Sequence, residues 1–177
     1  MEFDLREFSE EQFYEFIKLL LGSIYHSINI ESKLVDHGND SDEINTTFVK
    51  SISDIEECLF EMEYTISNPD LINIVRDIMY NENLMDCIFI TEKPILLFCQ
   101  HRDFNDEEFG GRNYCDLPTL SKYKVSQTNK CSLYELCKAA FIIKPRKFNK
   151  FNETFNNCKI ITNDEVIIIK ISFDYGT

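Results

Sequence analysis

Basic and aromatic side chains alternate within one stretch of this 177-residue chain. The densest part, residues 144–151, runs Lys-Pro-Arg-Lys-Phe-Asn-Lys-Phe. Lysine and arginine neutralise phosphates and release the counterions that surround a nucleic acid, and aromatic rings stack on unpaired bases. The combination predicts a nucleic-acid-binding site, and the residues expected to form it are Lys122, Lys124, Lys130, Lys144, Arg146, Lys147, Phe148, Lys150 and Phe151.

Charge is divided unevenly along the chain. Residues 1–108 hold 25 acidic and 7 basic side chains, a net of −18, whereas residues 109–177 hold 6 acidic and 11 basic, a net of +5. The two halves give the overall net charge of −13. A basic region on an acidic chain indicates an anionic partner. We expect the basic half to dock on an RNA-containing or polyanionic assembly, for example a ribonucleoprotein, and the acidic half to stay solvated or face basic protein.

Two other interpretations of the basic segment stay open. Its phenylalanines could point into the core, and its cations could pair with the acidic half of the same fold. Exposed ion pairs contribute only about 0–1 kcal/mol each and require no partner. An acidic protein is the other candidate partner. The sequence does not show whether the basic residues form one surface, and the three interpretations differ on that point.

Cysteine and histidine suggest two chemistries besides binding. Thiolates and imidazoles are zinc ligands, and the candidate ligands are Cys99, His101, Cys115, Cys131 and Cys137. The short spacing usual within zinc-ligand pairs is missing. Cys99 and His101 could instead act as nucleophile and base, with Asp103 orienting the imidazole. No oxyanion donor accompanies them, so we expect no catalytic residue. Because the usual ligand spacing is missing, we also expect no bound metal, and nothing else in the sequence indicates a cofactor. A zinc- or thiol-dependent protein is the third hypothesis.

Three capping boxes mark the starts of helices. They lie at residues 9–12, 53–56 and 132–135, and each begins with serine and ends with glutamine or glutamate. The first precedes apolar residues at i, i+3 and i+4 spacing, which predicts an amphipathic helix of about five turns. Asn68 followed by Pro69 predicts the start of another helix, because proline fits its first position.

Short apolar runs predict strands at residues 44–49, 87–90, 95–99, 159–162 and 165–175. Turn residues predict one hairpin around Glu92-Lys93-Pro94 and another around Asn163-Asp164. Helices dominate up to residue 82, and strands and loops follow. The pattern predicts an α+β fold in which helices of the N-terminal half pack on a mainly antiparallel sheet formed by hairpins of the C-terminal half.

Composition favours one globular domain over residues 1–177, with an acidic helical half at 1–108 and a basic strand-and-loop half at 109–177. An apolar content of 44% suffices for one core. No run of about 18 apolar residues is present, and the acidic N-terminus lacks the features of a secretory signal. The seven cysteines follow no disulfide framework. We therefore expect a cytoplasmic or nuclear protein with reduced thiols, no membrane association and no enzymatic activity.

The first predicted helix also carries a family resemblance. Its residues 15–17 (Glu-Phe-Ile) and 22–25 (Gly-Ser-Ile-Tyr) resemble the first helix of HORMA-domain checkpoint adaptors, and the order of helices and strands is similar to theirs. The resemblance implies a protein–protein interaction adaptor that holds a peptide under a mobile C-terminal safety belt. The chain ends soon after its last predicted strand, which leaves little to form such a belt. This adaptor, with binding nearly independent of salt, is the alternative to RNA docking.

Overall fold

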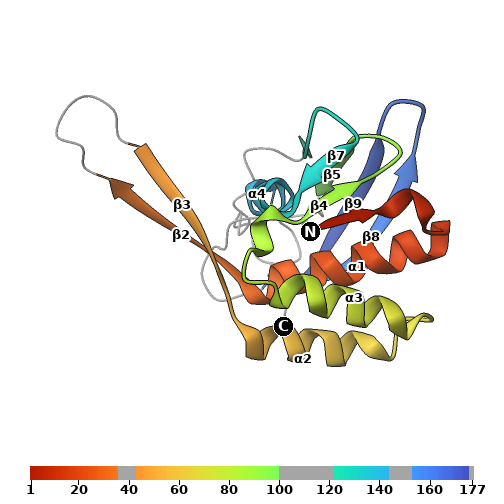
Figure 1. Cartoon of the computed structure of the whole chain (residues 1–177), viewed down its shortest axis with the longest axis horizontal. Coiled ribbons are helices and arrows are strands. Elements are labelled where there is room, and N and C mark those ends of the chain that lie inside the picture. The colour runs from red at the N-terminus through yellow and green to blue at the C-terminus, as the bar shows by residue number, and fades with distance from the viewer. Residues whose placement is uncertain (36–42, 100–121, 144–152, 176–177) are drawn as a thin grey trace, which may run out of the picture.

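The computed structural model describes residues 1–35, 43–99, 122–143 and 153–175 (Figure 1). The helices are α1 (Glu10–Ser27), α2 (Ile52–Glu63), α3 (Pro69–Tyr80) and α4 (Leu133–Ile143), with the 3-10 helices η1 (Leu5–Glu7) and η2 (Leu84–Asp86). The strands are β1 (Glu2–Asp4), β2 (Ile28–Val35), β3 (Glu43–Lys50), β4 (Ile88–Ile90), β5 (Ile95–Cys99), β6 (Lys122–Lys124), β7 (Lys130–Ser132), β8 (Glu153–Thr162) and β9 (Ile167–Tyr175).

Within the described residues, these strands form three sheets. The largest has the order β6-β5-β9-β8, a smaller one has the order β1-β4-β7, and β2 and β3 form an antiparallel hairpin that extends away from the rest of the molecule (Figure 1). Pairing is antiparallel except between β5 and β9 and between β1 and β4. The predicted α+β class is confirmed, with helices mostly in the N-terminal half and the largest sheet in the C-terminal half.

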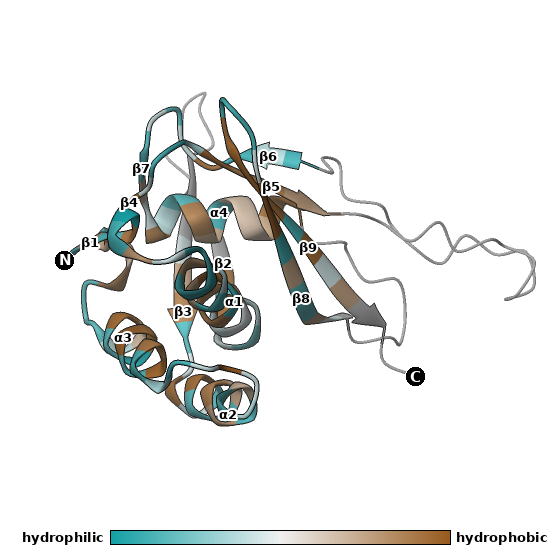
Figure 2. Ribbon diagram, turned by 90° about the vertical axis from the view of Figure 1, so that its right-hand side faces the viewer, coloured by the Kyte–Doolittle hydropathy of each residue, from teal (hydrophilic) through white to brown (hydrophobic). Residues whose placement is uncertain are grey.

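Helix α1 lies at the centre, between the α2–α3 pair and the four-stranded sheet (Figure 2). It contacts β8 on one side and α2 and α3 on the other. Phe16, Leu20 and Ile24 have no exposed surface, and neighbouring positions of the helix are equally buried. A helix that is apolar on most of its circumference is stable only when it is covered on several sides. Its place between two layers satisfies that requirement.

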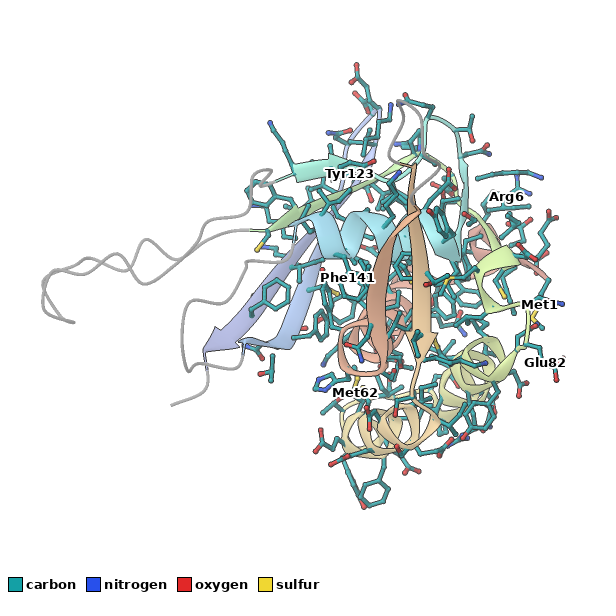
Figure 3. The ribbon with its side chains drawn as sticks, turned by 90° about the vertical axis from the view of Figure 1, so that its left-hand side faces the viewer. Met1, Arg6, Met62, Glu82, Tyr123 and Phe141 are labelled. Carbon is teal, nitrogen blue, oxygen red and sulfur yellow. The ribbon has the colours of Figure 1, made fainter. Side chains whose placement is uncertain are left out.

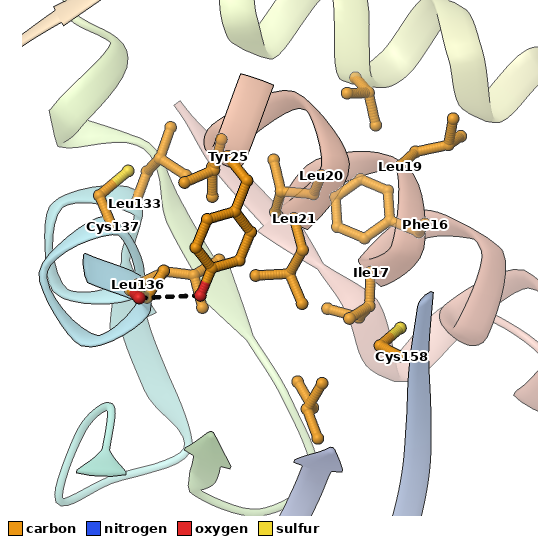
Figure 4. Close-up of a cluster of buried hydrophobic side chains, with 14 of the residues drawn as sticks. Phe16, Ile17, Leu19, Leu20, Leu21, Tyr25, Leu133, Leu136, Cys137 and Cys158 are labelled. Atoms are coloured by element: carbon orange, nitrogen blue, oxygen red, sulfur yellow. Dashed lines mark hydrogen bonds between the residues drawn. The ribbon is translucent and has the colours of Figure 1, made fainter. Parts of the chain in front are cut away.

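Tyr25, near the end of α1, links the helix to α4 and to the sheet (Figure 4). Its hydroxyl donates a hydrogen bond of 2.8 Å to the carbonyl of Ala140. Its ring stacks on Phe155 at 5.8 Å and meets Phe173 edge-on at 5.1 Å. Burial raises the pKa of Tyr25 well above its usual value, so the hydroxyl remains a donor. These contacts fix the sheet against α1 through β8 and β9.

The local helix signals act largely as predicted. The Ser9 hydroxyl accepts from the Gln12 amide at 3.2 Å, and the Gln12 side chain accepts from the Ser9 amide at 2.9 Å. Ser132 and Glu135 form the same reciprocal pair at the start of α4. Asn68 caps α3 with Pro69 as the first helical residue. The box predicted at residues 53–56 is wrong.

Helix α2 begins at Ile52 with Ser51 as its N-cap, and no side chain caps it. The Ser51 amide donates to the carbonyl of Ser27 at 2.8 Å. This bond holds Ser51 beside the end of α1, where the β2–β3 hairpin ends. The position of Ser51 makes it the N-cap, so α2 begins before Ser53. No apolar run predicts β2, which pairs with β3 along its whole length.

The hairpin predicted around Pro94 is also wrong, because its two strands belong to different sheets. β4 pairs with β1 and β7, and β5 pairs with β6 and β9. The Thr91 amide donates to the carbonyl of Asn129, and the Ile167 amide donates to the carbonyl of Pro94, at 2.8 and 2.9 Å. The segment between the strands therefore crosses from one sheet to the other. The hairpin of β8 and β9 around Asn163-Asp164 is confirmed, and β8 carries a bulge between Phe155 and Asn157.

One carboxylate is buried between α1 and the α2–α3 connection. Glu15 is 7% exposed and accepts hydrogen bonds from the amides of Ser67 at 2.7 Å and Asn68 at 3.3 Å, and from the Ser67 hydroxyl. Desolvation acts to raise the pKa of Glu15, but these hydrogen bonds outweigh it and lower the pKa. The ionised side chain therefore holds the α2–α3 pair against α1.

Candidate functional site: a basic face of the four-stranded sheet

Three of the nine predicted nucleic-acid-binding residues lie in the described part of the chain. Lys122 and Lys124 are exposed on β6, and Lys130 is exposed on β7. Lys130 belongs to the three-stranded sheet and pairs with Glu2 at 3.5 Å, so it does not join the other two. The remaining predicted residues lie outside the described residues, namely Lys144, Arg146, Lys147, Phe148, Lys150 and Phe151.

The alternation of β6 sends its two lysines to one side of the sheet. Lys122 lies opposite Phe98, and Lys124 lies opposite Leu96 on the neighbouring strand β5. Tyr123, between them, packs against the core on the other side (Figure 3). Directly opposed residues on paired strands share a face, so the register identifies the cross-strand neighbours of these lysines within the described sheet.

One row crosses all four strands. From Lys122 it continues through Phe98 on β5 to Lys170 on β9 and Lys159 on β8. The Lys170 ammonium lies over the ring of Phe98, 5.6 Å from its centroid. Three cations and one aromatic ring therefore stand side by side on the sheet, contributed by segments far apart in the sequence.

The adjacent row runs from Lys124 through Leu96 and Ile168 to Ile161. We call the two rows together the basic sheet face, which comprises Leu96, Phe98, Lys122, Lys124, Lys159, Ile161, Ile168 and Lys170. It holds four lysines and four half-buried apolar residues and no acidic side chain. The other side of the sheet is covered by α1, against β8, and by α4, against β5 and β6 (Figure 2).

The lysines of this face are not neutralised by the described part of the protein. The ion pairs found there join Arg6 to Asp4, Arg76 to Glu56 and Lys130 to Glu2, and none involves the basic sheet face. Lys159 and Lys170 are directly opposed on antiparallel strands, an arrangement in which like charges repel. An anion bound over the sheet would remove that repulsion.

Sequence reasoning missed Phe98 and Lys170 and did not select Lys159 for the site. The signal available was alternation, because Lys170 is the charged residue within the apolar run Ile167–Ile171. Alternation alone shows that Lys170 shares a face with Ile168. It does not show that β9 pairs in parallel with β5, and only that pairing brings Lys170 to Phe98.

Two aromatic residues next to the predicted segment do point inward, as the first alternative interpretation proposed. Phe155 is 9% exposed and stacks on Tyr25, and Phe141 packs against the core near Phe48 (Figure 3). Phe155 is therefore unavailable for stacking on bases, and Phe141 is partly covered. On the sheet, Phe98 is the aromatic residue of the basic face.

The cysteines form no site within the described residues, where no group of metal-binding side chains comes together. The six described cysteines are buried. Burial raises the pKa of Cys131, Cys137 and Cys158 to about 12, so these thiols remain protonated and make poor nucleophiles or ligands. The other members of the two candidate sets, His101, Asp103 and Cys115, lie outside the described residues.

Comparisons with protein-family models, with curated proteins and with solved structures find no match to this chain. They add no support to the resemblance to HORMA-domain adaptors. No helix in the described segments has the length and apolar character needed to cross a membrane.

Proposed function

We propose that this protein is a non-enzymatic binding factor that docks on an RNA-containing assembly through the basic sheet face. The observation that carries the proposal is that Lys122, Lys170 and Lys159 share one row of the sheet with Phe98, that Lys124 stands in the next row, and that neither row contains a carboxylate. The residues predicted at 144–151 extend this interface in the proposal. A cytoplasmic or nuclear location accords with such a partner.

Phosphate contacts supply the affinity in this proposal. Each lysine that neutralises a phosphate of a single strand contributes about −0.7 to the slope of log K against log salt. Four lysines therefore give a slope of about −3, and binding weakens steeply as salt is added. An uncharged or acidic protein partner would show a much smaller slope.

The aromatic ring favours unpaired RNA over a duplex. A base that stacks on an aromatic side chain contributes about 1–3 kcal/mol, and only an unpaired base exposes its ring in this way. The remainder of the protein works in the same direction, because the overall charge of −13 repels any long polyanion that extends beyond the sheet. We infer that the ligand is a short exposed strand or loop of a larger ribonucleoprotein whose proteins face the acidic half.

The first test compares two lysine pairs of equal charge. Lys122→Gln with Lys124→Gln removes two charges from the basic sheet face, and Lys130→Gln with Lys138→Gln removes two exposed charges elsewhere. Binding of a fluorescein-labelled oligouridylate is measured by anisotropy over a range of salt concentrations. The first pair is expected to weaken binding roughly 10- to 30-fold at ~0.1 M salt and to reduce the slope by about 1.4. The second pair should change neither quantity.

Equal losses from both pairs would mean that the attraction is diffuse, and the proposal would then be wrong. A second arm changes Lys144, Arg146, Lys147 and Lys150 together to glutamate, which should weaken binding further if the predicted segment extends the interface. Purification of the tagged protein from its native cells at low salt, with and without RNase, identifies the assembly. A discrete protein partner that survives both RNase and added salt would support the peptide-adaptor alternative instead.

A further inference from the structure

Helix α2 presents two aromatic rings to solvent. Phe60 is 61% exposed and Tyr64, at the C-cap, is 81% exposed, the highest values among the large apolar side chains of the described residues. Their rings meet edge-on at 5.9 Å. Ile52, 46% exposed, lies two turns before Phe60 but on the flank of the helix, about 80° around the axis from Phe60. The opposite side of α2 is buried against α1 and α3.

Carboxylates frame the two rings. Helix α2 holds five acidic residues and no lysine or arginine. At about 100° per residue, Phe60 and Tyr64 lie near the middle of the exposed side, and Glu57 and Glu61 lie along one edge of it. We call this surface, formed by Glu57, Phe60, Glu61 and Tyr64, the aromatic face of α2.

Of the two carboxylates on the other edge, Glu56 and Glu63, Glu56 already has partners. Glu56 accepts hydrogen bonds from the Arg76 guanidinium at 2.9 Å and from the Tyr80 hydroxyl. These bonds, led by that from Tyr80, lower the pKa of Glu56. Within the part of the chain that the structure describes, Glu57 and Glu61 have no such ion pair. The free charge of this surface is therefore negative and lies beside the rings.

This composition defines the chemistry of a ligand. A scattered exposed apolar residue is ordinary on a protein surface, but adjacent aromatic rings are the usual anchors of protein interfaces. Charges at the edge of such an interface steer the partner and select its sign. A complementary surface carries apolar side chains in the centre and lysine or arginine at its edge, which is the pattern of a basic amphipathic helix.

We propose that the aromatic face of α2 binds a basic amphipathic helical segment of a partner protein. The surface lies at the opposite end of the molecule from β6, as the positions of Met62 on α2 and Tyr123 on β6 show (Figure 3). The two proposed binding surfaces are therefore spatially separate. This inference rests on observations separate from those that support RNA docking.

The experiment uses the full chain and a synthetic probe. The probe is a fluorescein-labelled helical peptide of leucine and lysine with all leucines on one face, and its counterpart has glutamate in place of lysine. Binding is measured by anisotropy at low salt. Phe60→Gln with Tyr64→Gln is expected to weaken binding of the lysine peptide at least ~10-fold, because two central anchors are lost. The glutamate peptide should not bind.

Two charge variants serve as a matched pair. Glu57→Gln with Glu61→Gln should weaken binding several-fold, and Glu92→Gln with Glu165→Gln, in exposed turns elsewhere, should not. The aromatic variant removes side chains that are largely exposed, so its thermal unfolding should match that of the unchanged protein. The proposal is overturned if the lysine peptide does not bind, if the aromatic variant binds it equally tightly, or if prior saturation with oligouridylate abolishes the binding.

Discussion

The two faces of the four-stranded sheet are built from the same strands and have opposite properties. Leu97, Ile169 and Ile171 point toward the helices and are almost completely buried. Their neighbours on the other side include Phe98 and Lys170, which are only half-buried and contact each other. The comparison shows that stability and binding can be assigned to alternate residues of one strand, so that substitutions one position apart should separate them.

The largest expected effect concerns two adjacent leucines of β5. Leu97→Ala removes a side chain with no exposed surface and should lower the free energy of unfolding by about 2–5 kcal/mol. Leu96→Ala, on the basic sheet face, should cost less than about 1.5 kcal/mol because Leu96 is only half-buried. Urea unfolding of both variants checks the difference. Equal losses would show that the outer face is as closely packed as the inner one.

A smaller effect on stability is expected from Glu15. Unlike the lysines of the basic sheet face, this charged side chain is buried and hydrogen-bonded within the protein. Glu15→Gln should destabilise the protein by about 1.5–3 kcal/mol, because hydrogen bonds to a charged acceptor are lost or weakened. The lowered pKa gives the sign of the pH dependence. The contribution is complete above the ordinary value of 4.5 and disappears as pH falls through the lower pKa of the folded state.

Unfolding curves recorded between neutral and acidic pH measure this contribution. The difference in the free energy of unfolding between the unchanged protein and the Glu15→Gln variant should shrink as pH falls. Glu10→Gln, at an exposed position on the same helix, is the control and should show no such difference. A constant difference across the range would mean that folding leaves the pKa of this carboxylate unchanged.

The smallest effect on stability has the opposite sign. Lys159→Thr removes one of two directly opposed lysines and should raise the free energy of unfolding by about 0.2–1 kcal/mol. The same change should reduce the salt slope of oligouridylate binding by about 0.7. Lys130→Thr is the matched control, since it loses the ion pair with Glu2 and lies on another sheet. A variant that gains stability and loses binding would identify Lys159 as a residue of the interface.

Helix positions were predictable because their signals are local. The pairs Ser9–Gln12 and Ser132–Glu135 each contain both halves of a capping interaction within four residues, and the Asn68-Pro69 step needs no distant partner. The box predicted at Ser53 failed because a distant bond, from the Ser51 amide to Ser27, fixes the start of α2. Local patterns therefore locate helices to within a turn and leave their first residue to tertiary contacts.

Strand pairing was less accessible for the same reason. The strands β4 and β5 were recognised individually, but their separation into two sheets depends on β1, β7 and β9, which are distant in the sequence. For this reason, only some residues of the candidate site could be predicted from the sequence. Lys122 and Lys124 stood out in the basic segment, whereas Phe98 and Lys170 acquire meaning only through a parallel register that alternation cannot specify.

The bulge in β8 bears on how the sheet edges resist edge-to-edge aggregation. Within the described residues, β6 and β8 are the outer strands of their sheet, and an outer strand with free backbone groups is a template on which another chain can add. β6 is only three residues long and carries two lysines, and β8 is interrupted between Phe155 and Asn157 and carries Lys159. Short length, positive charge and irregularity each discourage such addition. The lysines proposed to attract a polyanion thus also discourage edge-to-edge aggregation.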